Sequence, residues 1–383
     1  MKSKHIFITT SFLTGLLLSI SNASQASSTS QTTQLLNEPD NNITKTSFYI
    51  EALYIKPYSN NLKYATFVAG NQPYMQSWHY QEINPNYHPA FELGFTYAIP
   101  HSTYGAGVSW VHLDSTDTSS KQAATSTDIA TVEFVGPPYE MSPPVFGIKS
   151  VNSKVNFNFD NILLNGSKFV EFGSHLEARF FGGVDILKLN QTITTTFGDY
   201  AGSPPTPYSY PLPPDPSFSF QTQNVSKYLG AGPDLGMSLR FNIYSGFGIM
   251  GEVLGLITAG TIKAHDSFTS TSSRLTALGI GTSQQEITSP PDTQVVLGAD
   301  SKLGIFYHYQ GANLPDVTIE AGYRIASFVN AISTINPSTL VQPGTVITTP
   351  EFSTGTMAIV STNATTHPFN FNGPFINLKI AIA

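Results

Sequence analysis

The sequence contains no cysteine and few charged residues, and these two shortages restrict the fold. Without cysteine the chain forms no disulfide, no thiolate metal site and no lipid anchor at a cysteine. Charged residues make up 11% of the chain, about half of the fraction that is usual in soluble proteins. After the N-terminus no segment has the uninterrupted apolar length of a transmembrane helix, since the nearest one, residues 247–259, contains Glu252. Stability must therefore come from a closed backbone hydrogen-bond network or from a large core.

The N-terminus has the pattern of an export signal. Lys2, Lys4 and His5 precede an apolar stretch over residues 6–20, and small residues follow it. We predict a signal peptide over residues 1–26, cleaved near Ala23 or Ala26; an uncleaved N-terminal anchor is the alternative. Residues 27–46 are polar and are expected to form a disordered periplasmic lead-in. The net charge of −7 argues against nucleic acid as a partner.

Apolar residues recur at every second position in segments such as 91–99, 155–159, 176–186, 317–325 and 376–382. This period indicates half-buried strands. Short links near 100–103, 165–168, 242–246 and 311–314 alternate with long, Pro/Ser/Thr-rich links between them. This asymmetry predicts an all-β fold over residues 47–383: a transmembrane antiparallel up-and-down β-barrel with short periplasmic turns and long extracellular loops. About ten strands are expected, or twelve if residues 62–68 pair with 75–80. A soluble all-β sandwich is the alternative.

The expected register places charged residues opposite the large apolar ones on each strand. The inward, pore-lining set is then Glu92, Lys154, Asp160, His175, Glu177, Arg179, Asp185, Asp234, Arg240, Glu252, Asp300, Lys302, Glu320, Arg324 and Lys379. A ten-stranded lumen is narrow. Small inward residues are expected to leave room in it: Gly94, Gly183, Gly236, Gly298 and Gly322.

Two glycine-rich blocks, residues 228–239 and 246–260, resemble the Legionella-type major outer-membrane protein family, which forms pores. Weaker blocks at 48–57, 176–184, 300–307, 318–325 and 373–376 follow in the family's order. The resemblance implies an outer-membrane barrel with porin-like permeability and no catalytic residues. One departure is the C-terminus, which ends in Ile382 and Ala383 instead of the aromatic residue that the barrel-assembly machinery reads.

The nine histidines show no metal-ligand spacing, and we expect neither a metal nor a cofactor. The predicted function is passive diffusion of small solutes or ions, with a slight preference for cations, in the outer membrane of a Gram-negative bacterium. Expected partners are outer-membrane lipid, the solutes, the assembly machinery and host surface ligands of the long loops. Two alternatives stay open. One is a surface adhesin or structural protein with a closed lumen. The other is a barrel hydrolase that uses acids and a histidine at the strand-to-loop junctions: Asp114, Asp117, Asp199, His265 and Asp266.

Overall fold

The computed structural model describes residues 46–71, 75–123, 133–136, 141–142, 148–173, 175–200, 215–271, 283–309, 315–343 and 355–382. The expected signal peptide (1–26), nearly all of the expected lead-in (27–46) and Ala383 lie outside these residues. The described strands are β1(Thr46–Ser59), β2(Lys63–Asn71), β3(Met75–Glu82), β4(His88–Ala98), β5(Tyr104–Gln122), β6(Glu133–Gly136), β7(Met141–Ser142), β8(Ile148–Phe172), β9(Leu176–Tyr200), β10(Asp215–Tyr244), β11(Phe247–Thr271), β12(Ser283–Thr288), β13(Asp292–Tyr309), β14(Asp316–Pro343) and β15(Gly355–Ile382). In the residues that the structure describes, no helix is long and apolar enough to cross a bilayer.

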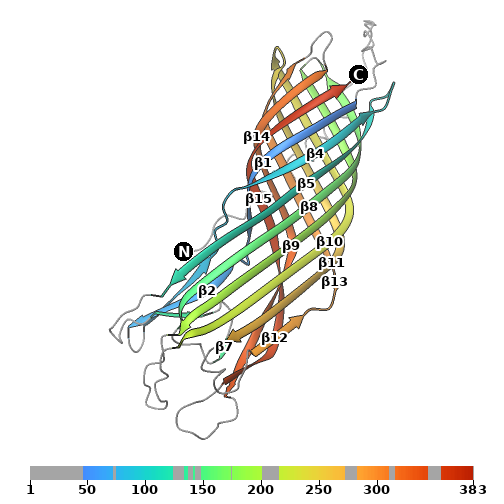
Figure 1. Ribbon diagram of the computed structural model, residues 1–383. Coiled ribbons are helices and arrows are strands. Elements are labelled where there is room, and N and C mark those ends of the chain that lie inside the picture. The colour runs from blue at the N-terminus through green and yellow to red at the C-terminus, as the bar shows by residue number, and fades with distance from the viewer. Residues whose placement is uncertain are drawn as a thin grey trace, which may run out of the picture. The chain divides into compact units, whose positions relative to one another are not determined.

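Ten long strands close into a ring of antiparallel pairs (Figure 1). The order is β1, β4, β5, β8, β9, β10, β11, β13, β14 and β15, which pairs back to β1. The predicted up-and-down barrel is therefore confirmed. The expected hairpin of residues 62–68 with 75–80 exists as β2 and β3, but it joins β6 in a separate three-stranded sheet. The twelve-strand alternative is wrong, because β2 and β3 do not enter the ring.

The strand register fixes the tilt of the barrel. Following paired residues once around the ring leads from Thr46 of β1 through all ten strands to Tyr58 of the same strand, a stagger of 12 residues. A stagger slightly larger than the strand number corresponds to strands tilted by about 40° from the axis. Such a barrel is only a little wider than an eight-stranded one, whose interior is filled by its own side chains.

One end of the barrel carries short turns and both described chain ends. A two-residue turn at Ser245 and Gly246 joins β10 to β11, and both residues have positive φ, 43° and 82°. Thr46 and Ile382 are paired at the same end. We assign this end to the periplasm, because outer-membrane barrels keep their short turns there. The expected short turn at 165–168 is wrong: these residues lie inside β8, which continues to Phe172, and β9 begins at Leu176.

The periplasmic half of the barrel exposes an apolar belt. Its outward side chains are mostly aliphatic or aromatic, with Lys168 and Ser301 among the exceptions. The most exposed apolar ones include Leu235 (73%), Leu303 (72%) and Ile376 (62%). The inward side chains of the same segments include buried Glu92, Asp234 and Glu320. Apolar outside and polar inside is the pattern of a bilayer-spanning barrel.

The extracellular half has the opposite arrangement. On β8, Val155, Phe157 and Phe159 are at most 1% exposed and face inward, whereas Lys154 and Asn152 face outward. Five phenylalanines from opposite walls meet here and form what we call the aromatic layer: Phe157, Phe159, Phe328, Phe369 and Phe371. Phe159 of β8 lies 5.2 Å from both Phe328 of β14 and Phe369 of β15, measured between ring centroids. This half is built like a soluble barrel around an apolar core.

An added outward charge should change the stability of the barrel by different amounts in the two halves. Leu303→Lys places a charge in the apolar belt and should destabilise the folded barrel in a bilayer by about 2–4 kcal/mol. The matched control Asn152→Lys adds the same charge to the exposed polar face of β8 and should change stability little. Denaturant titration of barrels folded into vesicles measures both. Equal losses in the two variants would contradict the two-zone arrangement.

Candidate functional site

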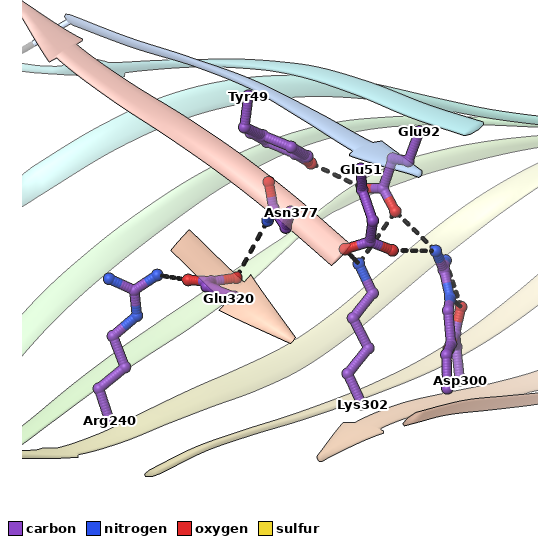
Figure 2. Close-up of polar contacts among 9 residues, drawn as sticks. Tyr49, Glu51, Glu92, Arg240, Asp300, Lys302, Glu320 and Asn377 are labelled. Carbon is purple, nitrogen blue, oxygen red and sulfur yellow. Dashed lines mark hydrogen bonds and ion pairs between the residues drawn. The ribbon is translucent and has the colours of Figure 1, made fainter. Parts of the chain in front are cut away.

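Buried charges span the lumen in the periplasmic half, and five of them form a connected group, the charge cluster (Figure 2). Its members are Glu51 of β1, Glu92 of β4, Asp300 and Lys302 of β13, and Arg324 of β14. All are between 0% and 8% exposed. The cluster therefore connects β1 and β4, on one side of β15 in the ring, with β13 and β14 on its other side.

Arg324 is the centre of the charge cluster. Its Nη1 donates to Glu92 Oε2 at 2.7 Å and to Glu51 Oε1 at 3.1 Å, while its Nη2 donates to Asp300 Oδ2 at 2.7 Å. Lys302 Nζ donates to both glutamates at 3.0 Å. Each cation thus bridges the same two carboxylates. This mutual neutralisation allows the charges to be buried, since an unpaired buried charge is strongly unfavourable.

A second polar group lies closer to the periplasmic end. Arg240 of β10 pairs with Glu320 of β14, and Glu320 also accepts a hydrogen bond of 3.0 Å from the Asn377 amide (Figure 2). Glu177, Arg179, Glu252 and Lys379 surround this group. The described lumen is therefore crossed by polar contacts at two successive levels.

Little free volume remains beside these contacts. Cavities of about 50 and 70 Å³ lie in the periplasmic half and share Arg179, Glu252 and Lys302 among their lining residues. Each has room for a few water molecules. A larger cavity of about 250 Å³ lies at the extracellular end and is lined by Asn61, Asp266 and other polar side chains. The aromatic layer fills the lumen between the charge cluster and this extracellular cavity.

Twelve of the fifteen side chains expected to line a pore face the barrel interior: Glu92, Glu177, Arg179, Asp185, Asp234, Arg240, Glu252, Asp300, Lys302, Glu320, Arg324 and Lys379. That they line a conducting path stays a prediction. The expected position is wrong for three others. Lys154 and Asp160 lie on the outer face of β8, because in that half the phenylalanines take the inward positions. His175 is exposed in the turn between β8 and β9.

Three of the five inward glycines do not widen the lumen as expected. Gly94 leaves space for the ring of Tyr49, which crosses it and donates a hydrogen bond of 2.6 Å to Glu92. Gly236 and Gly298 are filled in the same way by Phe181 and Leu256. At these three glycines a neighbouring side chain occupies the space that a Cβ atom would take, so the glycines allow close packing.

Three lumen-facing residues were not expected from the sequence to line the lumen: Glu51, Tyr49 and Asn377. Glu51 alternates with Ile50 and Ala52 in the first strand, and the period-two rule applied to residues 48–55 would have placed it inward. Asn377 sits at an inward position of β15 for the same reason. Their partners on other strands could not be read from the sequence.

The four acids and one histidine considered for a hydrolase are spread over different faces. Asp117 faces inward and accepts a hydrogen bond of 2.9 Å from the Asn86 backbone N–H; its other carboxylate oxygen lies 2.8 Å from His88 Nε2. Asp114 and His265 face outward, and Asp199 is the second-last residue of β9, with a φ of 57°. Asp266 faces inward from β11, and burial raises the pKa of its carboxyl to about 8. The structure does not bring these residues together. No group of three or more His, Asp or Glu side chains in the described residues is arranged to hold a metal ion.

A comparison with protein families matches residues 39–382 to the family described as Legionella pneumophila major outer membrane protein precursor. No curated protein matches the sequence.

Among solved structures, the outer membrane protease OmpT from Escherichia coli matches with a TM-score of 0.37 at 8% identity, over 88% of this chain and 97% of that chain. A Pseudomonas aeruginosa FadL homologue matches with a TM-score of 0.26 at 9% identity, over 88% and 90%. At these TM-scores the two likenesses carry no argument about function.

Removing the central cation tests the charge cluster. Arg324→Met leaves Asp300 without a cation in the charge cluster and leaves Glu51 and Glu92 with Lys302 alone. It should destabilise the folded barrel by about 3–5 kcal/mol. Lys154→Met removes an exposed outward cation and is the matched control, expected to have little effect. Denaturant titration in vesicles measures both, and equal stability of the two variants would contradict a neutralising role for Arg324.

Proposed function

The chain is an outer-membrane β-barrel of the Legionella pneumophila major outer membrane protein family, and on that premise we propose that it is porin-like. Small ions or solutes would diffuse passively through its lumen. The proposal includes no catalytic step, metal or cofactor.

The observation that carries the proposal is the row of ionisable side chains inside the bilayer-spanning half. Charges at membrane depth are expensive, and in membrane proteins they usually mark the path of ions or polar solutes. Replacing a buried ion network by apolar residues of similar size is often neutral or stabilising. Stability alone therefore gives no reason to retain five charges in the charge cluster. The water-sized cavities beside them support the same proposal.

Two barriers define the proposed path. The charge cluster is held by contacts of 2.7–3.1 Å, and the aromatic layer closes the level above it. An ion must displace side chains at both levels, since they are in mutual contact and the three lumen cavities described above lie beside them. We therefore propose a low conductance that is limited by side-chain rearrangement, in contrast to the wide aqueous channel of porins with 16–18 strands.

The aromatic layer also favours a second candidate, a surface or structural protein with a permanently closed lumen. Phenylalanine rings from opposite walls in mutual contact make an apolar plug that excludes water. In this case the barrel would act as a rigid support for the long extracellular loops.

Conductance separates the two candidates. Planar-bilayer recording of the refolded full chain should show small discrete steps. Phe369→Ala combined with Phe371→Ala should increase the step size several-fold, because it removes two of the five rings. The matched control is Phe48→Ala with Phe95→Ala, which removes two rings from the outer face (exposed Phe48 against Phe95 at 4.9 Å) and should leave the steps unchanged. Heat-modifiable gel migration confirms folding. A folded barrel that is silent both as wild type and with the widened layer would support the closed-lumen candidate.

The lumen charge predicts ion selectivity. Thirteen lumen-facing charges of the periplasmic half are named above, and acids outnumber bases among them by eight to five. The acids are Glu51, Glu92, Glu177, Asp185, Asp234, Glu252, Asp300 and Glu320, and the bases are Arg179, Arg240, Lys302, Arg324 and Lys379. Cations should therefore be preferred, because acidic linings raise the local cation concentration.

Reversal potentials under a salt gradient measure this preference. Glu252→Lys, which places a new charge at both periplasmic cavities, should reduce or reverse it. Lys154→Glu changes charge on the outer face and should have no effect. Anion preference in the wild-type protein would overturn the assignment of these groups as the lining.

A further inference from the structure

Above the apolar belt, three lysines gather on the outer face of adjacent strands. Lys188 of β9, Lys227 of β10 and Lys263 of β11 form what we call the lysine patch. Each is exposed between two buried inward neighbours, as Lys188 is between Leu187 and Leu189. The patch therefore faces away from the lumen and is separate from the proposed conduction path.

The strand register brings the three lysines close together. Lys227 lies directly opposite Lys263 across the β10–β11 pair. It also lies opposite Asn190, which is two residues from Lys188 on the same face of β9. Side chains directly opposite on antiparallel strands have Cβ atoms about 5 Å apart, and like charges in that position repel each other. In a chain with 18 basic residues, this juxtaposition calls for a compensating anion.

The protein itself supplies little compensation. Asp160 of β8 forms an ion pair of 2.9 Å with Lys188 Nζ and so holds Lys188 in place. Its other carboxylate oxygen lies 2.7 Å from His112 Nδ1. Among the described residues Lys227 and Lys263 have no ion-pair or hydrogen-bond partner for their side chains. Five acids lie on the paired segments of these strands, residues 176–198, 219–244 and 247–269. All five face the lumen: Glu177, Asp185, Asp234, Glu252 and Asp266. The outer face of these three strands is thus positively charged.

The level of the patch identifies its ligand. On β10 the next outward residue toward the periplasm is Leu229, which is 58% exposed and belongs to the apolar belt. On β9 the outward residues below Lys188 are Ile186 and the exposed Val184. The lysines thus stand immediately beyond the edge of the apolar belt on the extracellular side, at the depth of lipid headgroups. Lysines bind phosphate as point charges, and basic groups at this depth attract anionic headgroups.

We infer that the lysine patch binds the phosphate of an outer-leaflet lipid, with Lys227 and Lys263 as the principal contacts and Asn190 between the strands as an additional donor. The lipid's acyl chains lie against the apolar belt below. The ligand neutralises the opposed lysines, and the ion pair with Asp160 positions Lys188 beside it.

The test is a titration of the full-chain barrel, folded in neutral detergent, with bisphosphorylated lipid A, read by native mass spectrometry. Lys227→Gln with Lys263→Gln should weaken binding about 30-fold. Lys227→Arg with Lys263→Arg should retain it, because the charges remain. The matched control Lys154→Gln with Lys168→Gln removes two other lysines of the outer face of β8 and should leave the affinity unchanged. Heat-modifiable migration confirms that each variant folds.

Two further titrations identify the source of the phosphate. Dephosphorylated lipid A should bind wild type as weakly as the bisphosphorylated lipid binds the glutamine double variant. Inorganic phosphate at the same concentration should not compete, since it lacks the chains that contact the belt. The inference is overturned if the glutamine variant binds normally, if dephosphorylated lipid binds equally well, or if inorganic phosphate displaces the lipid.

Discussion

Backbone hydrogen bonding in a medium without water is the constraint on which the rest of this structure depends. A bilayer offers no partner to a free N–H or C=O group, so the sheet must close on itself. Ten strands with a stagger of 12 residues achieve this closure. The same numbers set the width of the lumen, which is small enough for side chains from opposite walls to meet. The charge cluster and the aromatic layer are both consequences of that width.

The barrel is longer than the bilayer requires, and its two halves meet different solvents. The apolar belt faces lipid, so the polar side chains of that half turn inward and must neutralise one another there. Beyond the belt the outer face meets water, and the lumen of that half becomes an apolar core around Phe159. The two-residue period is continuous along β8, but the direction in which its large apolar residues face changes. Leu164 is 47% exposed on the outer face, whereas Phe157 is fully buried in the lumen.

This reversal explains which expectations failed. The rule that large apolar residues face lipid placed Glu92, Asp300 and Arg324 correctly, because they lie in segments that cross the belt. The same rule misplaced Lys154 and Asp160, since residues 148–160 lie outside the belt and their phenylalanines pack inward. Asn165 and Gly166 suggested a turn, yet they pair with Gly183 and Gly182 in the middle of a hairpin. A turn-forming dipeptide is overridden when its strand neighbours supply a complete ladder of hydrogen bonds.

The sequence by itself determined the fold class, the closed antiparallel topology, the alternation of short and long connections, and the parity of the belt residues. These are local properties, because period-two patterns and turn composition are written in neighbouring residues. Only the tertiary structure decided that Glu51 and Arg324, 273 residues apart in the chain, share a hydrogen bond, and that Lys227 faces Lys263. It also decided that the lumen is filled. Such contacts depend on the stagger of the whole ring, and a shift of a single pair by two residues would keep every local pattern while replacing every partner.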